Sequence, residues 1–399
     1  MVSQLEKIII YVFSLISVLY IWRMLSVISG DLVDRPSVVE DLSESNKKPF
    51  TDNSAVERTV DSKEFVPLDP EFTLHQKKGS WGWRHLTGEE ATQEFHANQN
   101  VCKKPFEHCC LGQGRQPFSK MDGLEALWKL ENADDKSLQL GTFGDVLKHY
   151  PSGLKKESMC TFAFFGDSLS SDSAMGAVCE TLRLGYKLKS CNTSGMSGDN
   201  LYGDDRHYSC EENRYNGTEA SHFLLENEKS SSCPSVLIVF QYRMSYNITS
   251  LSASITELGG ILIFNWGVHC NFDDGCLEAT LAPLLRDAAD DAYQHWRFMF
   301  RETEPQHFAT QGGLFLQGEM KPHHRNCSDF RGRINTWRNI KVVKMIEDLG
   351  LTEKVTILPI SSALESLTKL HHGADCTHYC YDPHRLDVTW DALLTALQG

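Results

Sequence analysis

The chain has no basic stripe that could follow a nucleic-acid backbone. Its 39 Lys and Arg residues are scattered and outnumbered by 53 Asp and Glu residues, which gives a formal net charge of -14. No run of Lys or Arg alternates with aromatic residues, so the sequence argues against a nucleic-acid partner. Internal repeats are also absent, and 399 residues suffice for one large domain or two ordinary ones.

Cysteine is missing from the N-terminal quarter of the chain and then becomes frequent. All 13 cysteines lie between Cys102 and Cys380, as is typical of a domain that folds where disulfides persist, and the odd number leaves at least one unpaired. The same region holds four Asn-x-Ser/Thr sequons, which would be glycosylation acceptors in a secretory lumen: Asn192, Asn216, Asn247 and Asn326. Cysteines and sequons therefore predict the same compartment.

Charged residues are scarce near the N-terminus. Between residues 8 and 28 the only charged side chain is Arg23. If Arg23 reaches the interface, this segment comes close to the ~20 apolar residues that a membrane-spanning helix needs. We predict an uncleaved signal-anchor over 8–28 with a cytoplasmic tail over 1–7, because Lys7 precedes the apolar run and acidic residues follow it. The alternative is a cleaved signal peptide, since Ser29-Gly30 supplies small residues.

Periodic apolar residues are also scarce in the stretch that follows. From Asp31 to Leu74 the chain is rich in Ser, Asp, Glu, Lys and Pro, which predicts a flexible stem over residues 29–78. From Gly79 the pattern is that of a globular domain, 79–399. The expected organisation is a single-pass type II protein of the Golgi or another secretory-pathway membrane, with this domain in the lumen.

The globular part contains apolar runs of strand length that are continuous rather than alternating. They are Cys160–Phe165, Val236–Tyr242, Ile261–Trp266 and Val355–Leu358. Stretches with helical spacing lie between and after them: Ser171–Leu184, Leu281–His295, Ile334–Leu349 and Leu386–Leu397. Continuous apolar strands separated by helices favour a mostly parallel sheet covered on both faces. The predicted fold class is α/β, with three layers.

The first candidate for chemistry is Ser168. The segment Phe162–Ser168 is typical of a buried strand that ends in a turn at Gly166, with a helix a few residues later. This setting places the hydroxyl at the carboxyl end of a strand and near a helix N-terminus, whose amides can stabilise an oxyanion.

The second candidate segment is Asp375–Cys380, where an Asp precedes a His by three residues. On a tight helical turn Asp375 can reach one ring nitrogen of His378 while the other nitrogen points at Ser168. A serine hydroxyl needs such an imidazole to take its proton, and the imidazole needs an oriented carboxylate. Ser168, His378 and Asp375 therefore supply the three parts of a serine-hydrolase triad.

The alternative interpretation of this segment is a metal site formed by Cys376, His378 and Cys380. Thiols in an oxidising lumen tend to pair, and the chain has no second half-site of the CxxC kind, so we predict no metal. Two pairs of neighbouring histidines, His323-His324 and His371-His372, are predicted to be surface residues rather than ligands.

Two segments carry a resemblance to a known family. Gly166–Ser170 and Asp375–Cys380 resemble the end motifs of the PC-esterase group within the SGNH/GDSL hydrolases, in particular the trichome birefringence-like glycan O-acetyltransferases. Intermediate blocks fit in the same order: Ile263–His269, Phe300–Phe308 and Asp387–Asp391. The resemblance covers the chain from about Gly79 to its end, and the combination is more specific than either end motif.

The resemblance implies an SGNH-like α/β/α domain with Ser168 as nucleophile, His378 as general base and Asp375 as its orienting partner. It also implies an oxyanion hole made by the Ser168 amide, by Asn265, and by a glycine that is either Gly195 or Gly198. Asp167 is expected to hold the turn rather than to react, and His307 and Arg301 match family positions for which a functional and a structural role both stay open. Tyr379 stands where the family has Trp, and the acceptor sugar stays open.

The function that follows is O-acyl transfer, with acetyl as the expected group, to a glycan hydroxyl through an acyl-enzyme. The expected partners are a glycan acceptor, an acyl donor and the membrane, and no cofactor is expected to be tightly bound. One alternative is a carbohydrate acetyl esterase, in which water takes the acyl group. The other is a non-catalytic glycan-binding protein that keeps the same scaffold.

Overall fold

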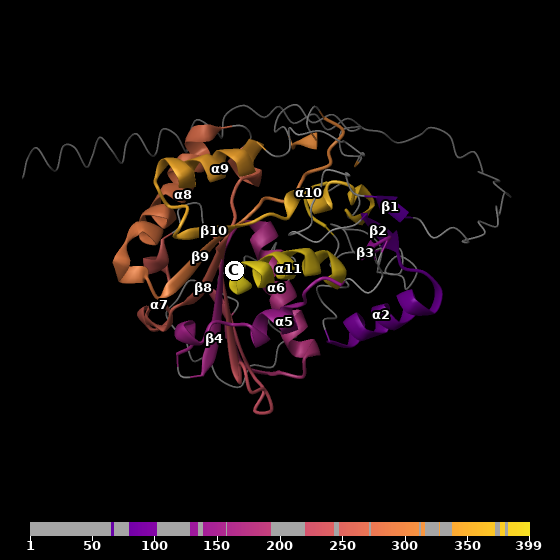
Figure 1. The fold of residues 1–399 in the computed structure, drawn as a ribbon, viewed down its shortest axis with the longest axis horizontal. Helices are drawn as coiled ribbons and strands as arrows, with labels where there is room; N and C mark the ends of the chain where they lie inside the picture. Colours follow the sequence, from indigo (N-terminus) through magenta and orange to yellow (C-terminus); the bar gives the residue numbers. More distant parts are fainter. Residues whose placement is uncertain are drawn as a thin grey trace, which may run out of the picture. The chain divides into compact units, whose positions relative to one another are not determined.

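The computed structural model describes two β-sheets and the helices around the larger one (Figure 1). The described residues are 65–67, 80–101, 128–134, 139–156, 158–192, 220–242, 247–270, 273–310, 313–315, 327, 337–371, 376–379 and 382–399. The predicted anchor over 8–28 lies outside them. Within the described part of the chain, no helix is both long enough and apolar enough to cross a bilayer.

The central sheet has seven strands and is mostly parallel. Their order across the sheet is β10 (Val355–Leu358), β9 (Trp296–Arg301), β8 (Gly260–Phe264), β4 (Met159–Gly166), β7 (Ser235–Tyr242), β6 (Ser221–Glu226) and β5 (Lys187–Asn192). Each pair from β10 to β7 is parallel, whereas β6 pairs antiparallel with β7 and with β5. The predicted α/β class with a mostly parallel sheet is therefore confirmed.

Both faces of the central strands are buried, and alternate residues of these strands belong to different cores. In β4, Phe162 and Phe164 face one core, and Ala163 and Phe165 face the other. All eight residues of β4 are buried, which explains why its sequence is a continuous apolar run.

Helices supply the other side of each core. The first core includes residues of α5 (Phe143–Lys148), α6 (Ser168–Arg183), α10 (Ser361–Leu364) and α11 (Pro383–Gln398). The second includes residues of α7 (Ala253–Leu258), α8 (Asp274–Ala289) and α9 (Trp337–Asp348). Figure 1 shows the two groups on opposite sides of the sheet. The arrangement is that of helices on both faces of one sheet.

Helices α6 and α11 approach each other closely. A Cβ built on Gly176 of α6 would lie 2.2 Å from Leu386 Cδ1 of α11, so only a glycine fits there without a shift. Thr389 and Trp390 of α11 are buried in the same layer. This contact links the helix that begins at Ser168 to the helix that follows His378.

The bounds of the predicted helices differ from those in the structure, and for two of them the difference has a local cause. Helix α6 begins at Ser168 rather than Ser171, because Asp167 is its N-cap. Helix α8 covers Asp274–Ala289 instead of Leu281–His295. Its end is set by Asp290, whose carboxylate accepts the N–H of Ala292 and starts a short 3-10 helix, Asp291–Tyr293.

A smaller antiparallel sheet has the order β1 (Phe65–Pro67), β2 (Trp81–His85) and β3 (Trp128–Asn132). Strand β1 falls within the segment predicted as stem, and α2 (Gly88–Val101) follows β2. The Trp128 N–H donates to Asp382 Oδ2 at 2.7 Å, and Trp83 Nε1 donates to the Ala363 carbonyl at 2.7 Å. These bonds join the small sheet to the C-terminal helices.

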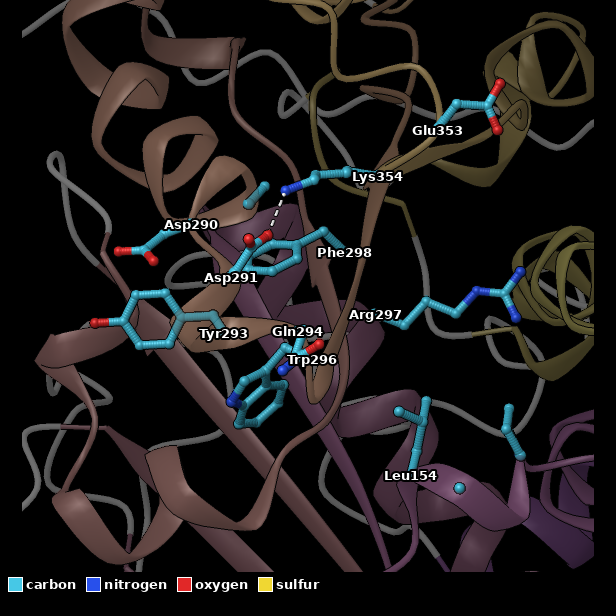
Figure 2. Close-up of a pocket in the computed structure, with 13 residues that line it drawn as sticks. Leu154, Asp290, Asp291, Tyr293, Gln294, Trp296, Arg297, Phe298, Glu353 and Lys354 are labelled. Carbon is cyan, nitrogen blue, oxygen red and sulfur yellow. Dashed lines mark hydrogen bonds and ion pairs between the residues drawn. The ribbon is translucent and has the colours of Figure 1, made fainter.

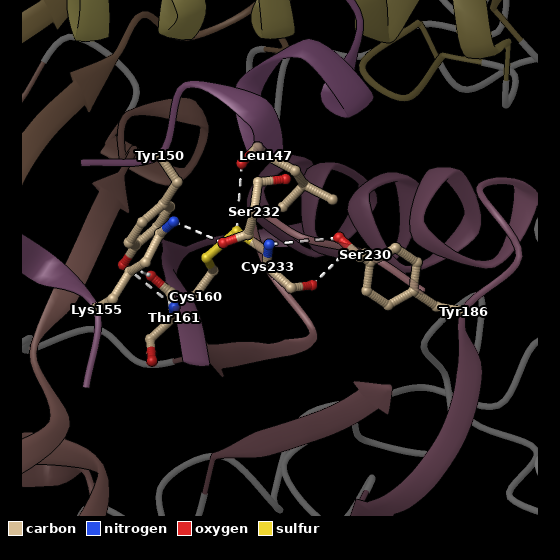
Figure 3. Close-up of a disulfide and its surroundings, with 9 residues drawn as sticks. All are labelled: Leu147, Tyr150, Lys155, Cys160, Thr161, Tyr186, Ser230, Ser232 and Cys233. Carbon is tan, nitrogen blue, oxygen red and sulfur yellow. Dashed lines mark hydrogen bonds between the residues drawn. A yellow bond between two sulfur atoms is a disulfide. The ribbon is translucent and has the colours of Figure 1, made fainter. Parts of the chain in front are cut away.

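Three disulfides join described cysteines: Cys160–Cys233, Cys270–Cys276 and Cys327–Cys376. The first joins the start of β4 to the segment just before β7, and the two strands are neighbours in the sheet (Figure 3). In the same region the Tyr186 hydroxyl donates to the Cys233 carbonyl at 2.6 Å. The prediction of a disulfide-bearing domain is therefore confirmed.

Candidate active site

Ser168 lies where β4 ends and α6 begins. The N–H groups in the first turn of a helix have no carbonyl acceptor within the helix, so they can bind an anion. Here the Leu169 N–H donates to Asp167 Oδ1 at 3.1 Å, and the Ser170 and Ser171 N–H groups donate to the Asp167 carbonyl. Ser168 itself is only partly buried. Its hydroxyl thus stands at the carboxyl edge of the parallel sheet, as predicted.

The backbone at Gly166 allows this turn to pass close to the neighbouring strand. A Cβ at this position would lie 1.9 Å from Ser170 Oγ and 2.6 Å from the Asn265 carbonyl oxygen. The Asn265 N–H donates to the Phe165 carbonyl at 3.0 Å, which holds the end of β8 beside the end of β4. A glycine is required because the two backbones meet here.

His378 and Ser168 are in direct contact. His378 Nε2 lies 2.6 Å from Ser168 Oγ, although the two residues are 210 positions apart in the chain. His378 is partly buried and follows directly after Cys376 and Thr377, which are both buried. The imidazole is within reach of the serine proton, which is the geometry that a general base needs.

The third predicted triad member, Asp375, lies outside the described residues, and so do both candidate glycines, Gly195 and Gly198. Asn265 is described and buried, at the end of β8. Its Nδ2 donates to the Arg301 carbonyl at 3.1 Å and to Thr303 Oγ1 at 2.9 Å. Both amide hydrogens therefore have acceptors in the structure, and the oxyanion role of Asn265 stays a prediction.

Asp167 is completely buried and acts as the N-cap of α6. Burial raises the pKa of this carboxyl, while the nearby charges of His269 and Arg301 and the hydrogen bond from Leu169 oppose the shift. The N-cap bond agrees with the expectation that Asp167 holds the turn. A carboxylate at a helix N-terminus is also favoured by the helix dipole.

The segment that carries His378 is fixed at Cys376 and Thr377. Cys376 forms a disulfide with Cys327, and its carbonyl accepts the His307 N–H at 2.9 Å. Gln306 Nε2 donates to Thr377 Oγ1 at 2.7 Å. Since the Cys376 sulfur is bonded to Cys327, it is not available as a thiolate, and the alternative of a metal site with Cys376 as a ligand is wrong.

A buried charged cluster lies in the segment after β9. Glu304 accepts from Arg301 Nη1 at 2.7 Å and from Arg385 Nη1 at 2.5 Å, and all three side chains are at most 2% exposed. The Arg385 guanidinium also lies 5.3 Å from the centre of the Tyr379 ring. One carboxylate thus joins β9, α11 and the residue next to His378. Arg301 therefore takes part in a buried structural cluster.

Sequence reasoning missed several residues that support His378. His371 was predicted to be a surface residue, but only 8% of it is exposed, because it packs against Tyr379 with ring centres 4.0 Å apart. Gln306 was not singled out, yet it joins Thr377 to α9 through Arg338 Nη2, 2.9 Å from its Oε1. The largely polar segment Glu302–His307, which directly follows β9, is the signal that could have indicated these contacts.

A cavity of about 550 Å³ lies at the other edge of the sheet, where β9 and β10 begin (Figure 2). Tyr293 and Trp296 contribute aromatic rings to its lining, and Lys354 Nζ lies 3.1 Å from Asp291 Oδ1 across it. None of the predicted triad residues lines this cavity. β4 and β9 run in the same direction, and Ser168 follows the C-terminal end of β4. Ser168 and the cavity therefore lie at opposite edges of the sheet.

Two of the four sequons fall on described residues. Asn192 ends β5, and Asn247 precedes a short 3-10 helix, Ile248–Ser250; both are partly buried. Thr249 Oγ1 donates to Asn247 Oδ1 at 2.9 Å, so the sequon's hydroxyl and amide are already in contact. Asn216 and Asn326 lie outside the described residues. Glycosylation at all four stays a prediction.

Comparisons of the chain with protein-family models, with curated proteins and with solved structures find no match. The function is therefore inferred from the site itself. A serine at a helix N-terminus, an imidazole in contact with its hydroxyl and a fixed segment behind that imidazole together can perform nucleophilic acyl transfer.

Proposed function

We propose that this protein is a serine-dependent O-acyltransferase, with acetyl as the group carried and a glycan hydroxyl as the acceptor. The α/β domain would then be a three-layer SGNH-like hydrolase fold, and the chain a relative of the PC-esterase group. The single observation that carries the proposal is the 2.6 Å contact between His378 Nε2 and Ser168 Oγ at the N-terminus of α6.

The proposed reaction has two halves. In the first, Ser168 Oγ attacks the acyl carbonyl of the donor while His378 Nε2 takes the hydroxyl proton. The tetrahedral oxyanion forms beside the first turn of α6, where the Ser168 N–H and the helix dipole stabilise negative charge. The intermediate then collapses, and His378 returns the proton to the leaving group of the donor.

In the second half an acceptor hydroxyl attacks the acyl-serine, and His378 takes its proton. Ser168 leaves from the new tetrahedral intermediate and recovers a proton from His378. Asp375 would orient the imidazole. If water replaces the sugar hydroxyl, the same residues perform ester hydrolysis, so the choice between transferase and esterase depends on which nucleophile reaches the acyl-enzyme.

The location that fits this function is the lumen of the Golgi or another secretory-pathway compartment. The disulfides of the described domain support it, because such bonds persist in oxidising compartments. The sequons and the apolar segment over 8–28 support the same placement. A type II signal-anchor with the catalytic domain in the lumen completes the proposal.

The test is to incubate the purified protein with an activated acetyl ester and a panel of glycans. We expect acetylated glycan from the wild type and neither acetyl-enzyme nor product from Ser168→Ala. The matched control is Ser173→Ala, in the same helix, whose hydroxyl bonds only to the Leu169 carbonyl among described residues. Acetyl-enzyme in Ser168→Ala would contradict the nucleophile assignment. Release of free acetate alone with every acceptor would replace transfer by hydrolysis.

A further inference from the structure

Behind His378 lies a pair of histidines in direct contact. His307 Nδ1 and His371 Nε2 are 2.6 Å apart, and both residues are buried. The outer nitrogens face backbone carbonyls: His307 Nε2 lies 2.8 Å from the Glu365 oxygen, and His371 Nδ1 lies 2.9 Å from the His378 oxygen. The chain of contacts therefore ends on the carbonyl of the residue that touches Ser168.

The number of protons in this pair follows from its contacts. A carbonyl oxygen only accepts, so each outer nitrogen must carry a hydrogen. A neutral imidazole has one N–H, and two neutral rings would then present bare lone pairs to each other at the inner contact. A separation of 2.6 Å between His307 Nδ1 and His371 Nε2 needs a third proton between them. With hydrogen bonds at all three contacts, the pair would hold three protons and one positive charge.

We propose that His307 and His371 share a proton and act as positioning residues that hold the carbonyl of His378. This inference rests on the proposed function, because it assigns the pair a purpose in placing the general base. The pair connects three separate segments: His307 follows β9, His371 follows α10, and His378 precedes α11. Without the inner hydrogen bond, His371 has less constraint on its orientation and the His378 backbone loses part of its support.

Among the described residues, the charged and titratable groups around the pair come from four segments. The Tyr379 ring stacks on His371, with its hydroxyl bonded to the Pro305 carbonyl at 2.9 Å and 3.4 Å from His307 Nδ1. Arg385 covers the Tyr379 ring, and Glu304 lies between Arg385 and Arg301. Glu365 contributes its carbonyl to the pair. Burial raises the pKa of Tyr379 well above its usual value, so its phenol stays protonated beside the pair.

Two substitutions at position 371 separate the two contacts of the ring. In His371→Asn the amide nitrogen takes the place of Nδ1, so the bond to the His378 carbonyl can persist while the contact with His307 is lost. In His371→Gln the amide reaches the place of Nε2, so the contact with His307 can persist while the bond to His378 is lost. We expect His371→Gln to lower kcat by about tenfold or more with little change in KM, because the base is misplaced.

The pH profile supplies the second kinetic readout. In the wild type, loss of the shared proton as pH rises removes the inner hydrogen bond, so kcat falls on the alkaline side. His371→Asn lacks the inner hydrogen bond at every pH, so we expect its kcat near neutral pH to lie already at the reduced alkaline level of the wild type and to lack the alkaline fall. Equal kcat values and equal pH profiles in wild type, His371→Asn and His371→Gln would overturn the inference.

A readout that needs no activity separates this inference from the proposed function. Nitrogen-15 NMR of histidine-labelled Ser168→Ala protein should show three ring N–H groups in the pair, with one far-downfield proton that His307→Asn removes. The control is His295→Gln, whose Nε2 faces the Thr256 carbonyl at 2.8 Å near the start of β8. Two neutral rings with one N–H each would overturn the inference even in an active enzyme. If the NMR spectra show the shared proton but the wild type has no transfer activity, only the proposed function is contradicted.

Discussion

Gly166 and Asn265 approach each other so closely that a side chain at position 166 would displace a neighbouring strand. A Cβ there would lie 2.6 Å from the Asn265 carbonyl oxygen and 1.9 Å from Ser170 Oγ. Contacts below about 3.0 Å force a shift, and here one of the two atoms belongs to backbone. The turn that presents Ser168 is thus fixed by the end of β8 as well as by its own residues.

The first prediction concerns Gly166→Ala. We expect the end of β4 to move away from β8, which displaces Ser168 from His378 and lowers kcat by about 100-fold, because a misplacement of about 1 Å has this effect. The control is Gly153→Ala, since nothing lies within 4 Å of a Cβ at that position. The kcat values of both variants are compared with wild type. A Gly166→Ala enzyme with wild-type kcat would show that the close approach is not needed.

The second prediction compares two disulfides. Replacing Cys327 and Cys376 by Ala should lower kcat by about tenfold or more, because it frees the segment that carries His378. Replacing Cys160 and Cys233 by Ala should leave kcat near wild type and lower the free energy of unfolding by about 2–4 kcal/mol, since this bond joins neighbouring strands away from the site. Urea denaturation and steady-state kinetics on both variants test the contrast. The prediction is wrong if the two double variants lose the same share of kcat.

The third prediction concerns the charge balance beneath His378. Glu304→Gln leaves two guanidinium groups, of Arg301 and Arg385, without their carboxylate. Breaking a buried pair in this way costs about 3–5 kcal/mol, so the variant should unfold at much lower urea concentration at pH 7. The exposed Glu347→Gln serves as the control and should stay within about 0.5 kcal/mol of wild type. Equal free energies of unfolding of the two variants would mean that other groups balance the charges of Arg301 and Arg385 when the Glu304 carboxylate is removed.

The fourth prediction concerns pH and Glu180. Burial raises the pKa of this carboxyl from 4.5 to about 7, with Arg183 opposing the shift and Asp387 and Glu94 adding to it. The folded state therefore binds the proton more tightly than the unfolded state, and stability is lost as pH rises from about 4.5 through 7. Over this pH range the free energy of unfolding of the wild type should fall by about 3 kcal/mol more than that of Glu180→Gln.

Urea denaturation at a series of pH values measures this difference. The exposed Glu228→Gln should follow the wild-type curve. If Glu180→Gln also follows it, Glu180 ionises at its ordinary pKa in the folded protein.

The strands at the centre of the sheet could be predicted because burial on both faces makes their sequences continuously apolar. Cys160–Phe165 lies within β4, and Val236–Tyr242 lies within β7. Strand β9 escaped prediction because Arg297 and Arg301 interrupt its apolar run. The charge of Arg301 is tolerated there because Glu304 and Arg385 complete a buried cluster, and Arg385 lies 81 positions beyond Glu304. The sequence around Arg301 and Glu304 therefore does not reveal Arg385 as their partner.

Distance along the sequence also decides which parts of the candidate site could be predicted. The contact between Ser168 and His378 could be predicted, because the chemistry of a hydroxyl nucleophile requires an imidazole at that place. The role of His371 could not, because two neighbouring histidines look like surface residues until His307, 64 positions away, is seen to cover one of them. Chemistry identifies the reacting groups, and long-range packing identifies the groups that hold them.

The tight contact between Gly176 and Leu386 has a consequence for motion. Helix α6 starts at Ser168, and α11 follows the segment of His378, so two helices in van der Waals contact each end near one of the two reacting groups. Densely packed helices shift as one body, because separating them opens a void. The hydroxyl of Ser168 and the imidazole of His378 are therefore expected to keep their spacing when the two helices shift, which is what the proposed transfer needs from its reacting pair.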